Sequence, residues 1–180
     1  GLYALAIALI LGLLSGMIAA SEPSSLRDYL TMIMGMTGIC IPSFVLGPLL
    51  VLIFSLKLGL LNVSGWNTAS DRILPALSLG MVYVAYISRL IRGSLLETMV
   101  QDYIRTARAK GLSEKIIIFR HALRGAILPV LSFLGPAAAG LITGSFVIET
   151  IFSIPGLGRF FVTAAFNRDY TMIMGNVVFY

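Results

Sequence analysis

The charged side chains of this chain gather between Arg89 and Arg124. Eight of the thirteen lysines and arginines lie there, opposed by three acidic residues, so this segment carries the whole net charge of +5. A cationic block of this kind can bind anionic lipid, nucleic acid or a soluble protein partner. Because long uncharged apolar segments flank it, we interpret 89–124 as a cytoplasmic loop of a membrane protein, with no nucleic-acid partner. The eight basic residues are Arg89, Arg92, Arg105, Arg108, Lys110, Lys115, Arg120 and Arg124.

Few other residues in the sequence have the types and spacing that catalysis requires. The single histidine, His121, lacks a partner at metal or catalytic spacing, so we expect it to pack or to lie at an interface. The single cysteine, Cys40, lies in an apolar run and offers no disulfide framework, so we expect a packing role for it. No glycine-rich loop of the type that holds ATP is present. The sequence predicts a non-enzymatic protein with no catalytic, cofactor or metal site of its own.

Apolar segments of membrane length make up most of the remaining chain. Hydrophobic residues account for 58% and charged residues for 12% of the sequence, whereas about 25% charged is usual in soluble domains. A helix crosses a bilayer in roughly 20 residues. We predict an all-α membrane protein, a polytopic helix bundle of about five membrane segments, the last one truncated. These segments are 1–20, 29–56, 73–88, 125–148 and 170–180, and all five lack Asp, Glu, Lys, Arg and His.

The basic block also sets the expected orientation. If 89–124 is cytoplasmic, alternation places 21–28 on the same side and places 57–72 and 149–169 outside. The chain begins and stops within apolar runs, so we expect an internal fragment of a longer protein, with residues 1–180 forming a single transmembrane domain. The absence of charges from the membrane segments argues against a proton-driven carrier.

Two short amphipathic helices are expected within the basic block. Leu96, Met99, Val100, Tyr103 and Ala107 recur at helical spacing, and Ile116, Phe119 and Leu123 share the face of a second piece, 114–124. Gly111 separates the two pieces, and Ser113 is a suitable N-cap for the second. Such helices either lie on the membrane surface or dock onto a soluble partner.

Prolines and paired glycines mark the membrane segments. The prolines, which remove backbone donors and favour bends, are Pro42, Pro48, Pro129 and Pro136. Gly12 with Gly16, and Gly140 with Gly144, have the spacing that allows close helix approach. These features predict a bundle that can bend or rock. The residues alone leave three functions open: a motor-driven permease, a self-contained channel or secondary carrier, and a membrane scaffold whose basic loop binds lipid.

Three stretches carry a resemblance to a known family. They are GICIPSFVLGPLL at 38–50, YIRTARAKGLSEKIIIFRHALRGAILPVLSFLG at 103–135, and GSFVIETIFSIPGLGRFFVTAAFNRDY at 144–170. Together they resemble the permease subunits of binding-protein-dependent ABC importers, in the dipeptide, oligopeptide and nickel branch, and most of all the B-type oligopeptide subunits. Arg105, Thr106 and Ala107 stand where the broad importer consensus has Glu-Ala-Ala, so no role of a leading acidic residue is transferred.

The resemblance implies a subunit that forms half of a translocation pathway for peptides or similar small solutes in a bacterial or archaeal cytoplasmic (inner) membrane. The implied partners are cytoplasmic ATPase subunits, which bind ATP and magnesium, a paralogous permease and an extracytoplasmic substrate-binding protein. The implied coupling loop is 89–124, and its interface with the ATPase is Arg105, Thr106, Ala107, Arg108, Lys110, Gly111, Leu112 and Ser113. The implied outer gate, facing the binding protein, is Glu149, Pro155, Gly156, Arg159 and Phe160. The transported ligand, whether peptide, glutathione-like or nickel chelate, is left open.

Overall fold

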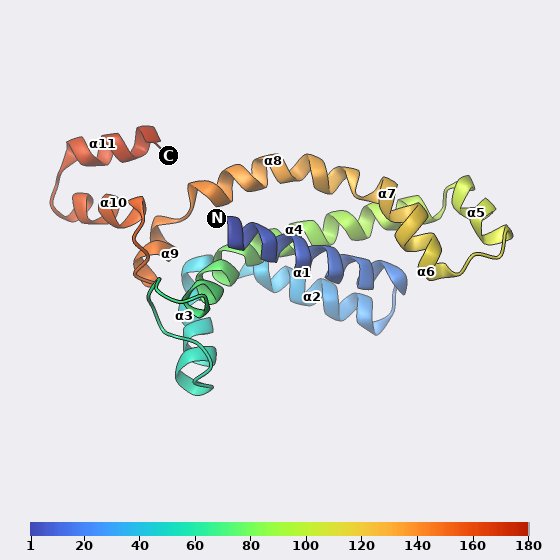
Figure 1. Cartoon of the computed structure of the whole chain (residues 1–180), viewed down its shortest axis with the longest axis horizontal. Helices are drawn as coiled ribbons and strands as arrows, with labels where there is room; N and C mark the ends of the chain where they lie inside the picture. The colour runs from blue at the N-terminus through green and yellow to red at the C-terminus, as the bar shows by residue number, and fades with distance from the viewer. Residues whose placement is uncertain (180) are drawn as a thin grey trace. The chain divides into compact units, whose positions relative to one another are not determined.

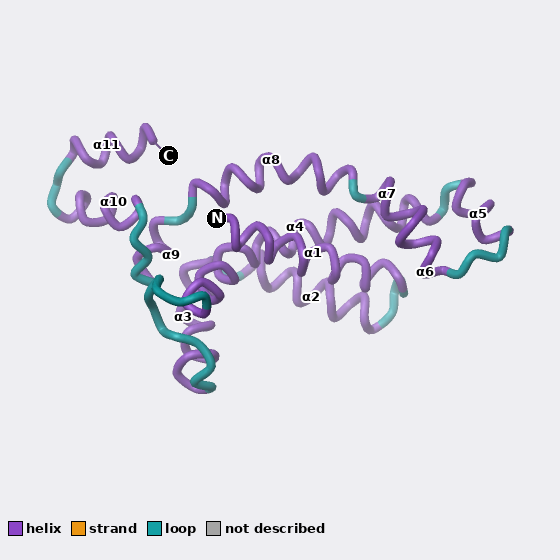
Figure 2. Tube along the Cα trace, viewed as in Figure 1, coloured by secondary structure: helices purple, strands orange, loops and turns teal. Residues whose placement is uncertain are grey.

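The structure, a computed structural model, describes residues 1–179, and these form helices and connecting loops without a strand (Figures 1 and 2). Two compact units are present: 1–7 with 40–81 and 138–180, and 8–39 with 82–137. We call them unit 1 and unit 2. The helices are α1 (Leu2–Ser21), α2 (Leu26–Cys40), α3 (Ser43–Leu50), η1 (Val51–Lys57), η2 (Ser70–Arg72), α4 (Ile73–Met99), α5 (Asp102–Ala109), α6 (Glu114–Ile116), η3 (Ile117–Ala122), α7 (Leu123–Ala126), α8 (Leu128–Thr143), α9 (Phe146–Ile151), α10 (Leu157–Phe166) and α11 (Tyr170–Phe179).

Three helical stretches of the described chain are long and apolar enough to cross a membrane: Leu2–Ser21, Ser70–Met99 and Leu128–Ile151. They correspond to the predicted segments 1–20, 73–88 and 125–148. The middle one is longer than predicted because α4 continues past Arg89 and Arg92 to Met99. The predicted segment 170–180 begins as α11, while Tyr180 lies outside the described residues, so the fifth crossing stays a prediction.

The predicted segment 29–56 is not one straight helix. It is broken between α2 and α3, so a fourth crossing exists only if this broken pair forms one span. The break follows from Pro42, which has an extended ψ of 142° and disfavours a helical conformation at Ile41. A second proline, Pro48, lies inside α3 and removes one more backbone donor. The chain then widens into the π-helix η1.

Close packing between α1 and α4 organises unit 2. A Cβ on Gly12 would lie 2.8 Å from Cβ of Ile87, and a Cβ on Gly16 would overlap Ile91 and the carbonyl of Ser88. The predicted role of Gly12 and Gly16 in close helix approach is therefore confirmed. Glycines at this spacing let backbones meet where a larger residue would hold them apart.

In unit 1 the core is built from Leu74, Ile148 and Phe152, which are almost fully buried. The loop 57–72 joins this core, since the N–H of Gly65 donates a 3.1 Å hydrogen bond to the carbonyl of Phe152. Gly144 does not serve the helix packing predicted for it. It follows the end of α8 with a φ of +84°, a conformation that suits glycine and terminates a helix.

Candidate functional site

The basic loop folds as two helical pieces joined by a turn at Gly111, as predicted. The first piece is shorter than expected, because α4 ends at Met99 and α5 begins only at Asp102. The second piece is continuous through α6, η3 and α7. Ser113 occupies the N-cap position of α6 with extended backbone angles, but its side chain makes no capping hydrogen bond.

Gly111 has a left-handed backbone conformation, with a φ of +76°. Its N–H donates a 2.9 Å hydrogen bond to the carbonyl of Arg108, which closes the last turn of α5. No heavy atom lies within 4 Å of the position that a Cβ would take on this residue. The turn therefore needs glycine for its backbone angles and not for lack of space.

Arg108 ties the two helical pieces together across this turn. Its Nε donates to Oε1 of Glu114 at 2.7 Å, and its Nη2 donates to Oε2 at 3.3 Å. Its Nη1 reaches the carbonyl of Met99 at 3.5 Å. The hydrogen bonds from Arg108 lower the pKa of the Glu114 carboxyl below its usual value. Arg108, predicted to contact a partner, thus also holds the loop in shape.

The faces of the two pieces differ from those predicted. Ile104 and Ala107 are the buried residues of α5, and α5 packs against η3. In η3 the buried residues are Ile117 and Ala122, five positions apart, because a π-helix turns more widely than the α-helix assumed from the sequence. Of the residues that the sequence placed on the two shared apolar faces, Ala107 is buried as α5 packs, and three are half-buried, namely Leu96, Met99 and Leu123. The other four are exposed: Val100, Tyr103, Ile116 and Phe119.

The predicted contact residues of the loop divide by exposure. Ala107 is only 6% exposed, so it belongs to the packing between α5 and η3, and Leu112 is half-buried. The other six lie on the surface: Arg105, Thr106, Arg108, Lys110, Gly111 and Ser113. His121 is half-buried in η3, and Cys40 is exposed at the end of α2 and does not pack inside this chain.

The segment predicted to form the outer gate is held by the carboxylate of Glu149. Its Oε2 accepts a 2.8 Å hydrogen bond from the N–H of Gly158. A Cβ on Gly156 or Gly158 would collide with this carboxylate, and one on Gly144 would lie 2.9 Å from Oε1. The three glycines therefore let the carboxylate approach the backbone between α9 and α10. Pro155, Arg159 and Phe160 are exposed, and Gly156 is half-buried.

The loop 57–72 is organised around Asp71, a residue that the sequence did not single out. Its carboxylate is 7% exposed and accepts hydrogen bonds from Asn62 Nδ2 at 2.6 Å, from the Thr68 hydroxyl at 2.7 Å, and from the backbone of Asn67 and Thr68. The neighbouring Arg72 lines a cavity of about 150 Å³ in unit 1. The other polar or aromatic lining residues include Tyr3, Trp66, Ser145 and Glu149.

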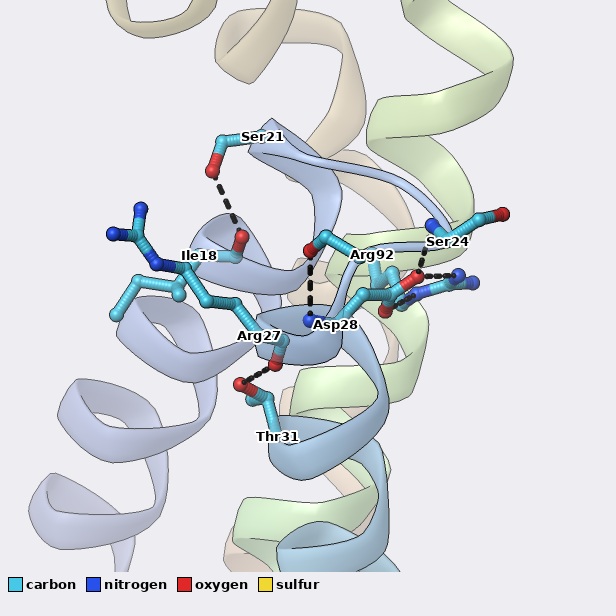
Figure 3. A network of polar contacts seen from close by, with 8 residues as sticks. Ile18, Ser21, Ser24, Arg27, Asp28, Thr31 and Arg92 are labelled. Carbon is cyan, nitrogen blue, oxygen red and sulfur yellow. Dashed lines mark hydrogen bonds and ion pairs between the residues drawn. The ribbon is translucent and has the colours of Figure 1, made fainter.

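A second buried carboxylate joins the α1–α2 turn to α4 (Figure 3). Asp28 is 2% exposed, and its two oxygens accept from Nε and Nη2 of Arg92 at 2.6 and 2.5 Å. Asp28 also accepts from the N–H of Ser24. Within residues 1–179 no cluster of His, Cys, Asp or Glu has the arrangement to hold a metal ion.

Residues 12–180 match the family model described as the binding-protein-dependent transport system inner membrane component. The chain belongs to this family. The predicted family and its inner-membrane location are therefore confirmed.

Individual relatives of this transport family are similar over almost the whole chain. The oligopeptide transport system permease protein OppB of Haemophilus influenzae is 51% identical over 97% of the chain. The protein of the same name from Escherichia coli K12 is 50% identical over the same share. The dipeptide transport system permease protein DppB of Bacillus subtilis is 47% identical over the full chain. The chain spans 58% of the length of each of these relatives.

The sequence of this permease family member did not indicate a role for Asp28, because its partner is distant in the chain. Asp28 and Arg92 are 64 positions apart, and Asp28 stands in a short polar break that also contains Glu22 and Arg27. The available signal was the position of Arg92, which follows a membrane segment by four residues. A buried arginine requires a partner.

Proposed function

We propose that this chain is a transmembrane subunit of an ATP-driven importer and forms half of a translocation pathway for short peptides. The proposal combines family membership with the names of the similar relatives, which are oligopeptide and dipeptide permease proteins. The observation that carries it is the loop 89–124, a basic helical element that projects exposed apolar and cationic side chains. ATP hydrolysis is assigned to a separate cytoplasmic subunit.

The proposed topology has five crossings, with 21–28 and 89–124 inside and 57–72 and 149–169 outside. It is supported by contacts between loops assigned to the same side. Asp28, at the end of the first inner loop, pairs with Arg92 in the second. Gly65 of the first outer loop hydrogen-bonds to Phe152 of the second. At 1.5 Å per residue, the 27 residues of α4 extend about 40 Å, enough to join the two sides.

The proposed ATPase contact surface lies around the Gly111 turn. Arg105, Thr106, Lys110 and Ser113 would supply exposed polar contacts. Val100, Tyr103, Ile116 and Phe119, which are 45–64% exposed, would supply the apolar part of the interface. Interfaces bury aromatic and apolar anchors within a polar rim. Ala107, Arg108, Gly111 and Leu112 would act by fixing the shape of this surface.

The proposed outer gate is the segment between α9 and α10. Glu149 and the glycines around it would fix the backbone, while Pro155, Arg159 and Phe160 would face the binding protein or the mouth of the pathway. A paralogous permease would supply the other half of the pathway. A rigid-body shift of the loop, driven by the ATPase, would then bias the bundle between inward and outward forms.

The test is transport by the complete protein reconstituted in vesicles with its paired permease, binding protein and ATPase subunits. Peptide uptake should require ATP and every one of these partners. Uptake without an ATPase subunit would instead identify a self-contained channel or carrier. Retention of anionic lipid with no uptake and no bound ATPase would identify a scaffold. Mass spectrometry of the binding protein would identify the ligand.

A further inference from the structure

The ion pair between Asp28 and Arg92 joins the α1–α2 turn to the first part of the proposed coupling loop, 89–124. Asp28 lies in the first turn of α2, directly after the turn from α1. Arg92 lies in α4, seven residues before that helix ends at Met99, a separation of about 10 Å. The exposed part of the proposed coupling loop starts where α4 ends. A displacement of the C-terminal end of α4 is therefore transmitted directly to Arg92.

The geometry of the pair is specific. The guanidinium presents two parallel donors, Nε and Nη2, to the two oxygens of Asp28. Such two-point contacts fix orientation as well as distance. Asp28 is simultaneously held from its own side, because Oδ2 accepts from the N–H of Ser24 at 3.0 Å and the Ser25 hydroxyl accepts from the N–H of Asp28 at 3.2 Å. Figure 3 shows Ser24 of the α1–α2 turn and Arg92 of α4 meeting at Asp28.

The environment of the pair differs from that of an ordinary surface bridge. The Asp28 side chain is 3% exposed and that of Arg92 is 28% exposed. Taking two charges out of water offsets most of their mutual attraction, so a buried pair is a poor source of stability but a strict constraint on position. The same turn contains a contrasting pair, Arg27 with Glu22, whose side chains are 72% and 52% exposed.

A second contact, nearer the start of α4, holds α1 against the same helix. Gly12 and Gly16 of α1 lie directly against Ile87 and Ile91 of α4. The glycine contact keeps α1 close to α4, and the ion pair fixes the position of the α1–α2 turn along α4. With both contacts in place, we expect the α1–α2 hairpin and this part of α4 to move together as one rigid body.

We propose that Asp28 and Arg92 are positioning residues for transport, which make the α1–α2 hairpin follow α4 when the ATPase moves the coupling loop. The inference rests on the proposed function. Without the pair, α4 can shift while the hairpin stays behind. ATP hydrolysis then proceeds with less movement of the pathway, so that fewer peptides are carried for each ATP hydrolysed.

The test uses the complete importer in vesicles, with ATP hydrolysis and peptide uptake measured in the same preparation. Asp28→Asn should lower the number of peptides transported per ATP by about tenfold, within the range of about 5- to 150-fold typical of coupling between sites. Hydrolysis and subunit assembly should remain close to wild type. Asp28→Glu, which keeps the carboxylate, should recover part of the ratio. Glu22→Gln, which breaks the exposed pair in the same turn, is the matched control and should leave the ratio unchanged.

A double variant separates positioning from folding. Asp28→Leu with Arg92→Met removes both charges and keeps apolar volume. If the pair is purely structural, this double variant should form a stable complex with a normal number of peptides transported per ATP. The positioning role predicts a stable complex with a lowered ratio. A normal ratio in either Asp28→Asn or the double variant would overturn the inference. Absence of ATP-dependent uptake by the wild-type complex would overturn the proposed function and the inference together.

Discussion

Substitution of Gly111 tests whether the shape of the basic loop governs its docking. Valine in place of Gly111 must adopt a φ near +76°, which costs an L-residue roughly 1–2 kcal/mol and is least favourable for a β-branched side chain. The open surroundings of the site exclude a steric clash as a second cause. The whole cost is therefore conformational and should appear as a smaller population of the docking-competent turn.

The expected loss of affinity for the ATPase follows from the smaller population of the docking-competent turn. A penalty of about 1–2 kcal/mol reduces the competent fraction, and with it the apparent affinity for the ATPase, by roughly 5- to 30-fold. The assay is titration of the purified, detergent-solubilised permease pair with ATPase subunits. Thermal unfolding of the same samples should show an unchanged membrane bundle, because Gly111 is exposed and lies in a turn.

Asparagine at position 111 is the matched control. It adds a side chain of similar size but tolerates left-handed backbone angles better than other residues, so Gly111→Asn should bind the ATPase within a few-fold of wild type. Equal binding by the valine and asparagine variants would refute the reasoning. If both variants bound the ATPase equally weakly, the loss would come from contact by Gly111 itself and not from its backbone angles. Unaltered binding in both would show that the turn conformation is not required.

Four further outcomes are expected. Lys110→Glu reverses an exposed charge and should reduce ATP-coupled uptake without lowering the unfolding temperature, measured in vesicles and by thermal denaturation. Gly16→Leu overfills the contact with α4 and should cost about 1–3 kcal/mol of stability, whereas Gly93→Ala, at an open site on a helix, should not destabilise the bundle. The pKa of Glu114 is lowered, so its ion pair with Arg108 stabilises the folded loop above the ordinary glutamate pKa. This stabilisation is lost as the pH falls through the lowered pKa. The protection factors of the loop amides, corrected for the intrinsic pH dependence of exchange, should then fall by a factor corresponding to at most about 1 kcal/mol, and Glu114→Gln should remove this change. A cysteine replacing Phe160, which is 57% exposed, should react with an impermeant maleimide only from outside, and labelling only from inside would reverse the proposed topology.

The sequence predicted the helices whose signal lies in composition. The uncharged runs indicated α1, α4 and α8, and the paired residues Gly12 and Gly16 indicated that another helix approaches α1 closely. Gly111 was identified as a break because a glycine interrupts the helical pattern there. These features depend on local residue types, which a sequence displays directly.

Features set by backbone departures and distant partners could not be predicted in the same way. The face of the second loop helix was assigned with α-helical spacing, and the π-helical turn moved burial to Ile117 and Ala122. Segment 29–56 was uniformly apolar, so its hydropathy concealed the corner at Pro42. The partner of Asp28 lay in another helix. In the outer segment, Glu149 was selected by resemblance, whereas its contact with the Gly158 backbone required the folded chain.

The corner between α2 and α3 restricts which surroundings this part of the chain can tolerate. A helix interrupted at Ile41 and Pro42 leaves carbonyl oxygens without intrahelical donors, and hydrocarbon offers them none. At membrane depth, the backbone there must therefore meet water or a polar neighbour, so this bend cannot face the acyl chains of the lipid.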